Sequence, residues 1–140
     1  MSNPMTLIDQ LKRDEGLKLD VYRDSEGLLT IGYGHCLDRK GISQRVADQM
    51  LDDDIADAML LVRVRFPWTQ VLSEPRQAAF VNLVFNLGGQ GLATFKKFLG
   101  AAQSNQWEVA AAELLDSKYA KQVGDRATRI AQQLVSDEWV

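Results

Sequence analysis

The sequence predicts an α+β fold that is predominantly helical. Near the N-terminus, apolar and polar residues alternate on either side of a Ser-Glu-Gly turn, a pattern typical of two short antiparallel strands. The rest of the chain carries apolar residues at helical spacing between capping residues and helix breakers. With 140 residues, the chain is expected to form one domain, with two lobes. A chain this long buries about two-thirds of its unfolded surface, which is enough for a hydrophobic core.

The first helix and the hairpin have clear boundaries in the sequence. Thr6 is predicted to cap a helix, with Asp9 as its capping-box partner, and Gly16 ends that helix. Residues 17–23 and 29–33 then form the two predicted strands. Gly32 and Gly34 in the returning strand indicate a bend or a close approach of the backbone to another group.

A long helix is predicted next. Residues 36–41 are expected to form a short loop, and Ser43 then caps a helix over residues 44–64. A helix of this length spans about 30 Å. Pro67 ends the helical pattern, because proline cannot continue a helix.

The C-terminal half is predicted to be entirely helical. Ser73 caps a helix that is apolar almost all round, so we expect it to be the buried centre of a bundle, ending at Gly88-Gly89. Thr94 and Asn105 begin two further helices, and Asp125 caps the last one. The predicted lobes are a small one over about 14–42, a connecting helix over about 43–63, and a helical lobe over about 64–140 together with the first helix. A cleft between the lobes is expected to hold the ligand.

Composition excludes several classes of function. The net charge is −3 and the isoelectric point about 5.1, which argues against a nucleic-acid partner. Cys36 is the single cysteine, so no internal disulfide forms. The N-terminal residues carry charges and lack the apolar core of a signal peptide. The longest apolar run is too short and interrupted for membrane insertion.

Two carboxylates suggest acid–base chemistry. Glu15 falls at the C-terminal end of the first helix, where the negative end of the helix dipole disfavours a carboxylate and favours the protonated acid. Asp24 follows the first strand, and Thr30 lies on the returning strand with a hydroxyl that can hold a water. An acid and a carboxylate across one opening are what glycoside hydrolysis requires. On spacing alone, an ordinary charged surface remains the alternative.

Residues 14–16 (DEG) and 22–35 (YRDSEGLLTIGYGH) resemble the signature of the phage-type lysozymes, the T-even-like endolysins of glycoside hydrolase family 24. Residues 77–88 (QAAFVNLVFNLG) resemble the family's central C-terminal helix. Residues 111–130, which end in an Arg-Ala-x-Arg pattern, resemble its last segment. The resemblance covers nearly the whole chain and implies a lysozyme-like fold.

The resemblance also implies an activity and a setting. Glu15 would be the general acid, Asp24 the second carboxylate and Thr30 its partner at the attacking water, in an inverting muramidase. The substrate would be peptidoglycan, cut at the β-1,4 bond between N-acetylmuramic acid and N-acetylglucosamine by a monomer without cofactor or metal. The resemblance further implies an endolysin that stays in the host cytoplasm until a holin opens a path to the cell wall.

Further site residues follow from the same resemblance. Arg126 is expected to pair with Glu15, and His35 with Asp54, the latter pair linking the small lobe to the long helix. His35 and the adjacent Cys36 make a poor metal-ligand pair, because neighbouring residues in an extended stretch point to opposite faces. The residues expected to contact substrate, with core packing as the alternative for the two aromatic ones, are Phe85, Asn86 and Tyr119. The three tryptophans are expected to be packing residues.

Two features depart from the family pattern. Residues 36–41 are much shorter than the corresponding insertion of some relatives, which predicts that the third strand of the small lobe is missing. The acidic net charge predicts weak attraction to anionic cell walls and activity that depends on salt. Three other functions stay open: a non-catalytic glycan-binding module, a glycosidase acting on chitin or chitosan, and a helical interaction protein.

Overall fold

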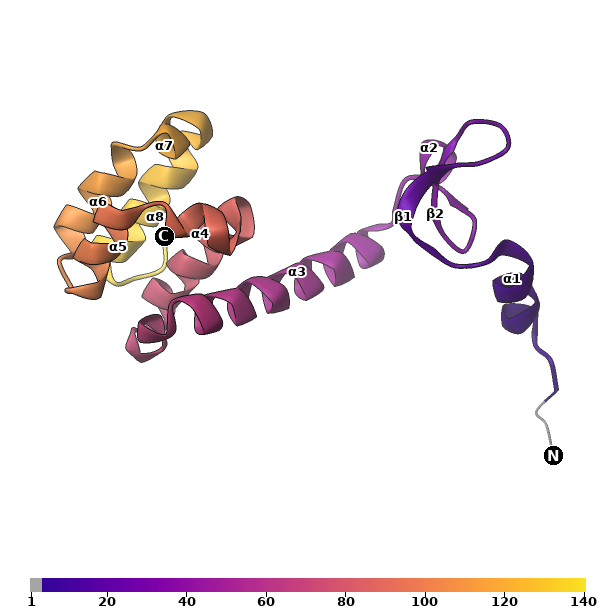
Figure 1. The fold of residues 1–140 in the computed structure, drawn as a ribbon, viewed down its shortest axis with the longest axis horizontal. Helices are drawn as coiled ribbons and strands as arrows, with labels where there is room; N and C mark the ends of the chain where they lie inside the picture. Colours follow the sequence, from indigo (N-terminus) through magenta and orange to yellow (C-terminus); the bar gives the residue numbers. More distant parts are fainter. Residues whose placement is uncertain (1–3) are drawn as a thin grey trace. The chain divides into compact units, whose positions relative to one another are not determined.

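A computed structural model describes residues 4–140 and confirms the predominantly helical α+β fold (Figure 1). The chain forms two compact units, of which the first ends at Gln49 and the second is Met50–Val140. The boundary lies within the long helix α3 (Gln44–Arg65). The assignment of the first helix to the helical lobe stays a prediction.

The first unit begins with helix α1 (Leu7–Glu15), whose predicted capping box is confirmed. The Asp9 N–H donates to Thr6 Oγ1 at 3.2 Å, and the Thr6 N–H donates to Asp9 Oδ2 at 2.9 Å. These hydrogen bonds to Thr6 lower the pKa of Asp9. At the other end, the N–H of Gly16 donates to Lys12 O at 3.0 Å, which confirms the predicted end of the helix.

A three-stranded antiparallel sheet follows, in the order β1 (Lys18–Arg23), β2 (Leu29–Gly32) and β3 (His35–Cys36). The predicted hairpin of β1 and β2 is confirmed. The expectation that a third strand is missing is wrong, because β3 pairs with β2 over its two residues. A tight turn at Tyr33-Gly34 makes this possible, since it reverses the chain directly after β2 and needs no long insertion.

The predicted loop over residues 36–41 is also corrected. Residues Leu37–Lys40 form a single helical turn, α2. Gly41 ends it with a positive φ of 57°, and its N–H donates to Leu37 O at 2.8 Å. Four residues are too few to show helical periodicity in a sequence, which is why the pattern did not indicate this turn.

Helix α3 has the predicted cap and nearly the predicted length. The Val46 N–H donates to Ser43 Oγ at 3.2 Å. Ala58 and Val62 of α3 are buried in the core of the second unit. After α3, Pro67 opens a 3-10 helix, η1 (Pro67–Val71), in place of a further α-helical turn.

The second unit is a helical bundle around a buried apolar core. Phe80 and Leu83 of the central helix are fully buried there, and Trp68 packs edge-on against Phe80 at 5.3 Å between ring centroids. Burial of such apolar side chains away from water favours the folded state of the unit. The helices are α4 (Glu74–Ala93), α5 (Lys96–Gln103), α6 (Trp107–Leu115), α7 (Lys118–Val123) and α8 (Asp125–Ser136).

Helices α4 and α8 are joined by hydrogen bonds to uncharged acceptors. Arg76 Nε donates to Leu134 O at 2.8 Å, and Gln133 Nε2 donates to Pro75 O at 2.6 Å. Arg76 also stacks over the ring of Trp107 on α6, 4.4 Å from its centroid. These contacts fix the N-terminal turn of α4 against the end of α8.

Several predicted helix boundaries in this unit are wrong by a few residues. Helical turns continue past Gly88, where the backbone breaks with a φ of 76° that a glycine tolerates. Helices α5 and α6 begin two residues after Thr94 and Asn105. The cap of α8 is Gly124 and not Asp125, because helix α7, which was not predicted, ends directly before it.

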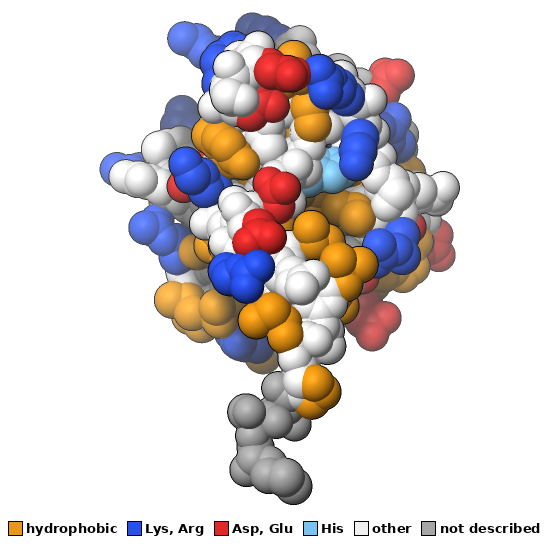
Figure 2. Space-filling view, turned by 90° about the vertical axis from the view of Figure 1, so that its right-hand side faces the viewer, with side chains coloured by type: hydrophobic (Ala, Val, Ile, Leu, Met, Phe, Trp, Pro, Cys, Tyr) orange, Lys and Arg blue, Asp and Glu red, His pale blue; other side chains and the backbone are white. Residues whose placement is uncertain are grey.

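The surface carries many apolar side chains. Figure 2 shows them on one face of the molecule, interspersed with charged ones. In the first unit they include Leu7, Ile8 and Leu11 of α1, which are exposed. Within residues 4–140, none of the helices combines the length and the apolar character that crossing a membrane requires.

Candidate functional site

Glu15 is the last residue of α1, and its side chain is exposed. Among the described residues of its own unit, no hydrogen bond or ion pair holds its carboxyl group. That group lies against the backbone of Gly34, in the turn between β2 and β3. An exposed carboxyl without a bound partner is available to a ligand.

Asp24 is fixed by the turn between β1 and β2. One of its carboxylate oxygens, Oδ1, accepts the N–H groups of Glu26 at 2.8 Å and Leu28 at 2.9 Å. Asp24 and Gly27 close the same turn through their backbones, with 2.9 Å between Gly27 N and Asp24 O. The second oxygen, Oδ2, makes no hydrogen bond within the described part of the first unit, so it is open to a water or a substrate hydroxyl.

Thr30 lies in the middle of the sheet and is 2% exposed. It is paired with Tyr22 of β1 and Cys36 of β3. Its hydroxyl donates to Leu28 O at 3.0 Å. With the proton used in this way, the oxygen can only accept further hydrogen bonds. A role of Thr30 at an attacking water stays a prediction.

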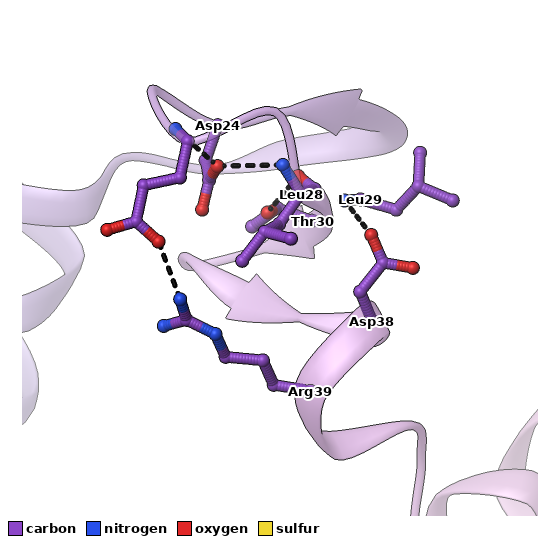
Figure 3. A network of polar contacts seen from close by, with 7 residues as sticks. Asp24, Leu28, Leu29, Thr30, Asp38 and Arg39 are labelled. Atoms are coloured by element: carbon purple, nitrogen blue, oxygen red, sulfur yellow. Dashed lines mark hydrogen bonds and ion pairs between the residues drawn. The ribbon is translucent and has the colours of Figure 1, made fainter.

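Helix α2 holds the turn that carries Asp24, a feature that the sequence analysis missed. The Leu29 N–H donates to Asp38 Oδ2 at 2.7 Å, and Arg39 Nη2 contacts Glu26 Oε2 at 2.6 Å. Figure 3 shows both side chains reaching from α2 to the hairpin. The signal was an Asp-Arg pair inside the short segment, but only the helical turn places both side chains toward the hairpin.

The two carboxyl groups are held at opposite ends of β2. Glu15 lies at Gly34, after the strand, whereas Asp24 is bonded to Leu28, before it. A strand rises about 3.4 Å per residue, so the first and last residues of β2, three steps apart, are separated by about 10 Å. Thr30 lies in the strand between the two ends.

His35 has a structural partner within the first unit. Its Nε2 lies 2.6 Å from Gly41 O, which ties β3 to the end of α2. The predicted pairs His35 with Asp54 and Arg126 with Glu15 each join residues of different units and stay predictions. Within residues 4–140, no three side chains of histidine, cysteine, aspartate or glutamate gather as a metal site would require.

The second unit contains a largely apolar hollow of about 650 Å³ between α3 and α4. Phe85, a predicted substrate contact, is 42% exposed and lines it. Trp139 lines it as well and is 65% exposed, so the expectation that every tryptophan is a packing residue is wrong for this one. It follows the end of α8 and is not among the residues of the apolar core.

Arg126 stands at the edge of this hollow with a neutral partner. Its Nε and Nη2 donate to Asn82 Oδ1 at 3.0 and 2.8 Å. Asn82 was not predicted as a functional residue, although it belongs to the segment that resembles the family's central helix. The amide carries no charge, so it does not neutralise the guanidinium of Arg126. The guanidinium also has N–H donors left for another group.

The two remaining predicted substrate residues differ in exposure. Asn86 is exposed on α4. Tyr119 is buried among the core residues, 5% exposed, and burial raises the pKa of its phenol. Its hydroxyl has no hydrogen-bond partner among the described residues. This environment favours the packing alternative for Tyr119.

Comparison with known proteins finds one matching family and several relatives. Residues 12–134 match the family described as Phage lysozyme. The pre-baseplate central spike protein Gp5 of Enterobacteria phage T4 is 30% identical over 91% of this chain, which spans 27% of that protein. The probable T4-type lysozyme 2 of Dictyostelium discoideum is 28% identical over 89% of this chain and 91% of its own length. An endolysin of Acyrthosiphon pisum secondary endosymbiont phage 1 is 33% identical, with 83% and 80% covered.

Replacing Asp38 tests whether α2 supports the turn that carries Asp24. Asp38→Ala leaves the Leu29 N–H without its acceptor, and we expect the free energy of unfolding to fall by about 1 kcal/mol. Asp38→Asn keeps an oxygen acceptor and is the matched control, with a smaller loss. Amide hydrogen exchange at Leu29 should accelerate in the alanine variant alone. Unchanged exchange in both variants would contradict a supporting role of α2.

Replacing Tyr119 tests its packing role. Tyr119→Phe removes a buried hydroxyl without a partner, so we expect the free energy of unfolding near neutral pH to rise by about 1 kcal/mol. The pKa of Tyr119 is raised in the folded state, so wild-type stability is retained below about pH 10 and falls as the pH rises toward the folded pKa. Denaturant unfolding at several pH values should show this fall in the wild type and not in the variant.

Proposed function

The chain belongs to the phage lysozyme family and has a lysozyme-type function, and we propose that it cuts the β-1,4 bond between N-acetylmuramic acid and N-acetylglucosamine in bacterial peptidoglycan. The observation that carries this proposal is the arrangement around β2. The carboxyl group of Glu15, which has no polar partner in the described part of its unit, lies at one end of the strand. The carboxylate of Asp24, with one oxygen held by two backbone N–H groups, lies at the other end. A glycosidase needs these two kinds of carboxyl group.

Glu15 is proposed as the general acid. It donates its proton to the glycosidic oxygen while the bond to the anomeric carbon breaks, so that the leaving sugar departs as an alcohol. Its environment supports this role, because the carboxyl group is exposed and no hydrogen bond or ion pair within the described part of its unit occupies it. Solvent then returns a proton to Glu15.

Asp24 is proposed as the base that activates water. Its Oδ1 is held by two N–H groups of the turn, which fixes the plane of the carboxylate and leaves Oδ2 to accept a proton from water. The water oxygen attacks the anomeric carbon from the face opposite the leaving group. Thr30 is proposed to accept a hydrogen bond from this water and so help to orient it.

The inverting course is part of the proposal. Inverting glycosidases hold their carboxyl groups about 6.5–9.5 Å apart, whereas retaining ones hold them about 5–5.5 Å apart. Attachment at opposite ends of β2 supports the wider spacing.

The stereochemistry can be measured directly. We expect the first product sugar to appear as the α-anomer, opposite to the configuration of the β-linked substrate, when peptidoglycan fragments are followed by proton NMR within minutes of mixing. Initial release of the β-anomer would contradict the role of Asp24 as a base and make it a nucleophile instead.

The biological setting is proposed from the relatives named endolysin and is host cell lysis. In this setting the protein remains in the host cytoplasm until a holin opens the inner membrane. The acidic net charge of −3 supports a need for close access to the wall, because it provides no long-range attraction to an anionic surface.

The decisive experiment compares three proteins on chloroform-treated Gram-negative cells. We expect the wild type to clear the suspension and Glu15→Gln to lose activity by a factor of at least about 100, since general acid catalysis contributes about 10²–10⁴. Asp14→Asn is the matched control, because Asp14 is the adjacent exposed carboxylate and is ion-paired with Arg13 at 2.9 Å. Its activity should stay near that of the wild type.

Other outcomes would favour other functions. Clearing by Glu15→Gln at the wild-type rate would mean that Glu15 is not the acid. Binding to purified peptidoglycan without cleavage, at every salt concentration, would indicate a glycan-binding module. Faster cleavage of chitin oligomers than of peptidoglycan would indicate a chitin-directed glycosidase.

A further inference from the structure

The position of the Glu15 carboxyl group needs a physical cause. The side chain is exposed, and within the described part of its unit it has no hydrogen-bond or ion-pair partner. A free glutamate side chain samples many rotamers, and ordering it costs conformational entropy. No polar contact fixes this side chain, so its position beside the sheet depends on the space that neighbouring residues leave for it.

The turn between β2 and β3 provides that space at Gly34. A methyl group placed on Gly34 would lie 2.8 Å from Glu15 Cδ and 3.3 Å from Glu15 Cγ, and closer still to Oε2. Carbon atoms pack at about 3.5–4.0 Å, so any larger residue would overlap with the carboxyl group. The carboxyl occupies space that exists only because residue 34 has no side chain.

A second contact joins the same two segments. Lys12 Nζ lies 5.5 Å from the centroid of the Tyr33 ring, in the range of a cation–π contact. Lys12 and Glu15 are three residues apart and so share one face of α1. Their contacts, Tyr33 and Gly34, are neighbours in the turn. The last turn of α1 thus approaches the β2–β3 turn at two neighbouring residues, through a cation–π contact at Tyr33 and a close approach at Gly34.

We propose that Gly34 is a positioning residue for Glu15, because only a residue without a side chain at this point of the turn lets the carboxyl group of Glu15 occupy its position beside the sheet. The inference rests on the proposed function for the role of Glu15. It extends that function by giving the small residue at position 34 a part in orienting the proton donor.

The test compares two alanine variants with the same backbone strain. Gly34 and Gly32 have positive φ angles of 66° and 71°, but a methyl group on Gly32 would meet nothing within 4 Å. Alanine at either position therefore strains the backbone, and only Gly34→Ala also displaces Glu15. We expect Gly34→Ala to lower kcat on soluble peptidoglycan at least tenfold more than Gly32→Ala, with similar KM values, since misplacing a reacting group by about 1 Å can cost a hundredfold.

The carboxyl carbon of Glu15 gives a readout that is independent of activity. Because Glu15 is exposed and flexible, its side chain can turn away from a methyl group at position 34 with little loss of stability. We expect the 13C resonance of the Glu15 carboxyl group to shift in Gly34→Ala and to stay near its wild-type position in Gly32→Ala. Equal shifts in the two variants would overturn the inference. If Gly34→Ala does not fold, folding of the Glu15→Ala/Gly34→Ala double variant would support the inference, and failure of that variant to fold would overturn it.

The two proposals fail in different ways. If Glu15→Gln clears cells as fast as the wild type, the proposed acid is wrong, although displacement of the Glu15 carboxyl by Gly34→Ala can still be seen in its 13C resonance. If Glu15→Gln is inactive while Gly34→Ala and Gly32→Ala have equal kcat and equal carboxyl resonances, the proposed acid stands and the positioning role of Gly34 is wrong.

Discussion

The pairing of β2 on both of its edges is the constraint on which the first unit depends. This four-residue strand is bonded to β1 on one side and to β3 on the other, and both connections are tight turns. One turn carries Asp24, and the other accommodates the carboxyl of Glu15. A shift of β2 along either neighbour would move Thr30 to the other face of the sheet and displace both turns together. Few residues thus fix the relative placement of the three proposed catalytic groups.

Local patterns predicted much of this unit correctly. The cap at Thr6, the end of α1 at Gly16 and the hairpin that follows depend on residues close together in the sequence, where capping and turn chemistry operate. Ser43 and the length of α3 follow from the same rules. Identifying Glu15 and Asp24 depended instead on a family resemblance, because an isolated pair of acids on a surface has no distinctive pattern.

The contacts that could not be predicted involve residues brought together by turns. Asp38 bonds to Leu29 and Arg39 to Glu26 only because α2 is a helical turn, and a segment of four residues gives no periodic signal. Arg126 with Asn82 joins positions that are 44 residues apart. Tyr33-Gly34 forms a turn tight enough to add β3 without a longer insertion, which overturned the expectation drawn from segment length.

The ion pair that supports the hairpin differs in charge and exposure from two of the contacts that join α4 and α8. Arg39 of α2 and Glu26 are both exposed, and dissolved salt screens the attraction between such side chains. The contacts from Arg126 to Asn82 and from Arg76 to Leu134 O end on an amide and a backbone carbonyl, which carry no charge. Rising ionic strength therefore weakens one support of the hairpin that presents the proposed base and leaves these two contacts of the helical unit in place.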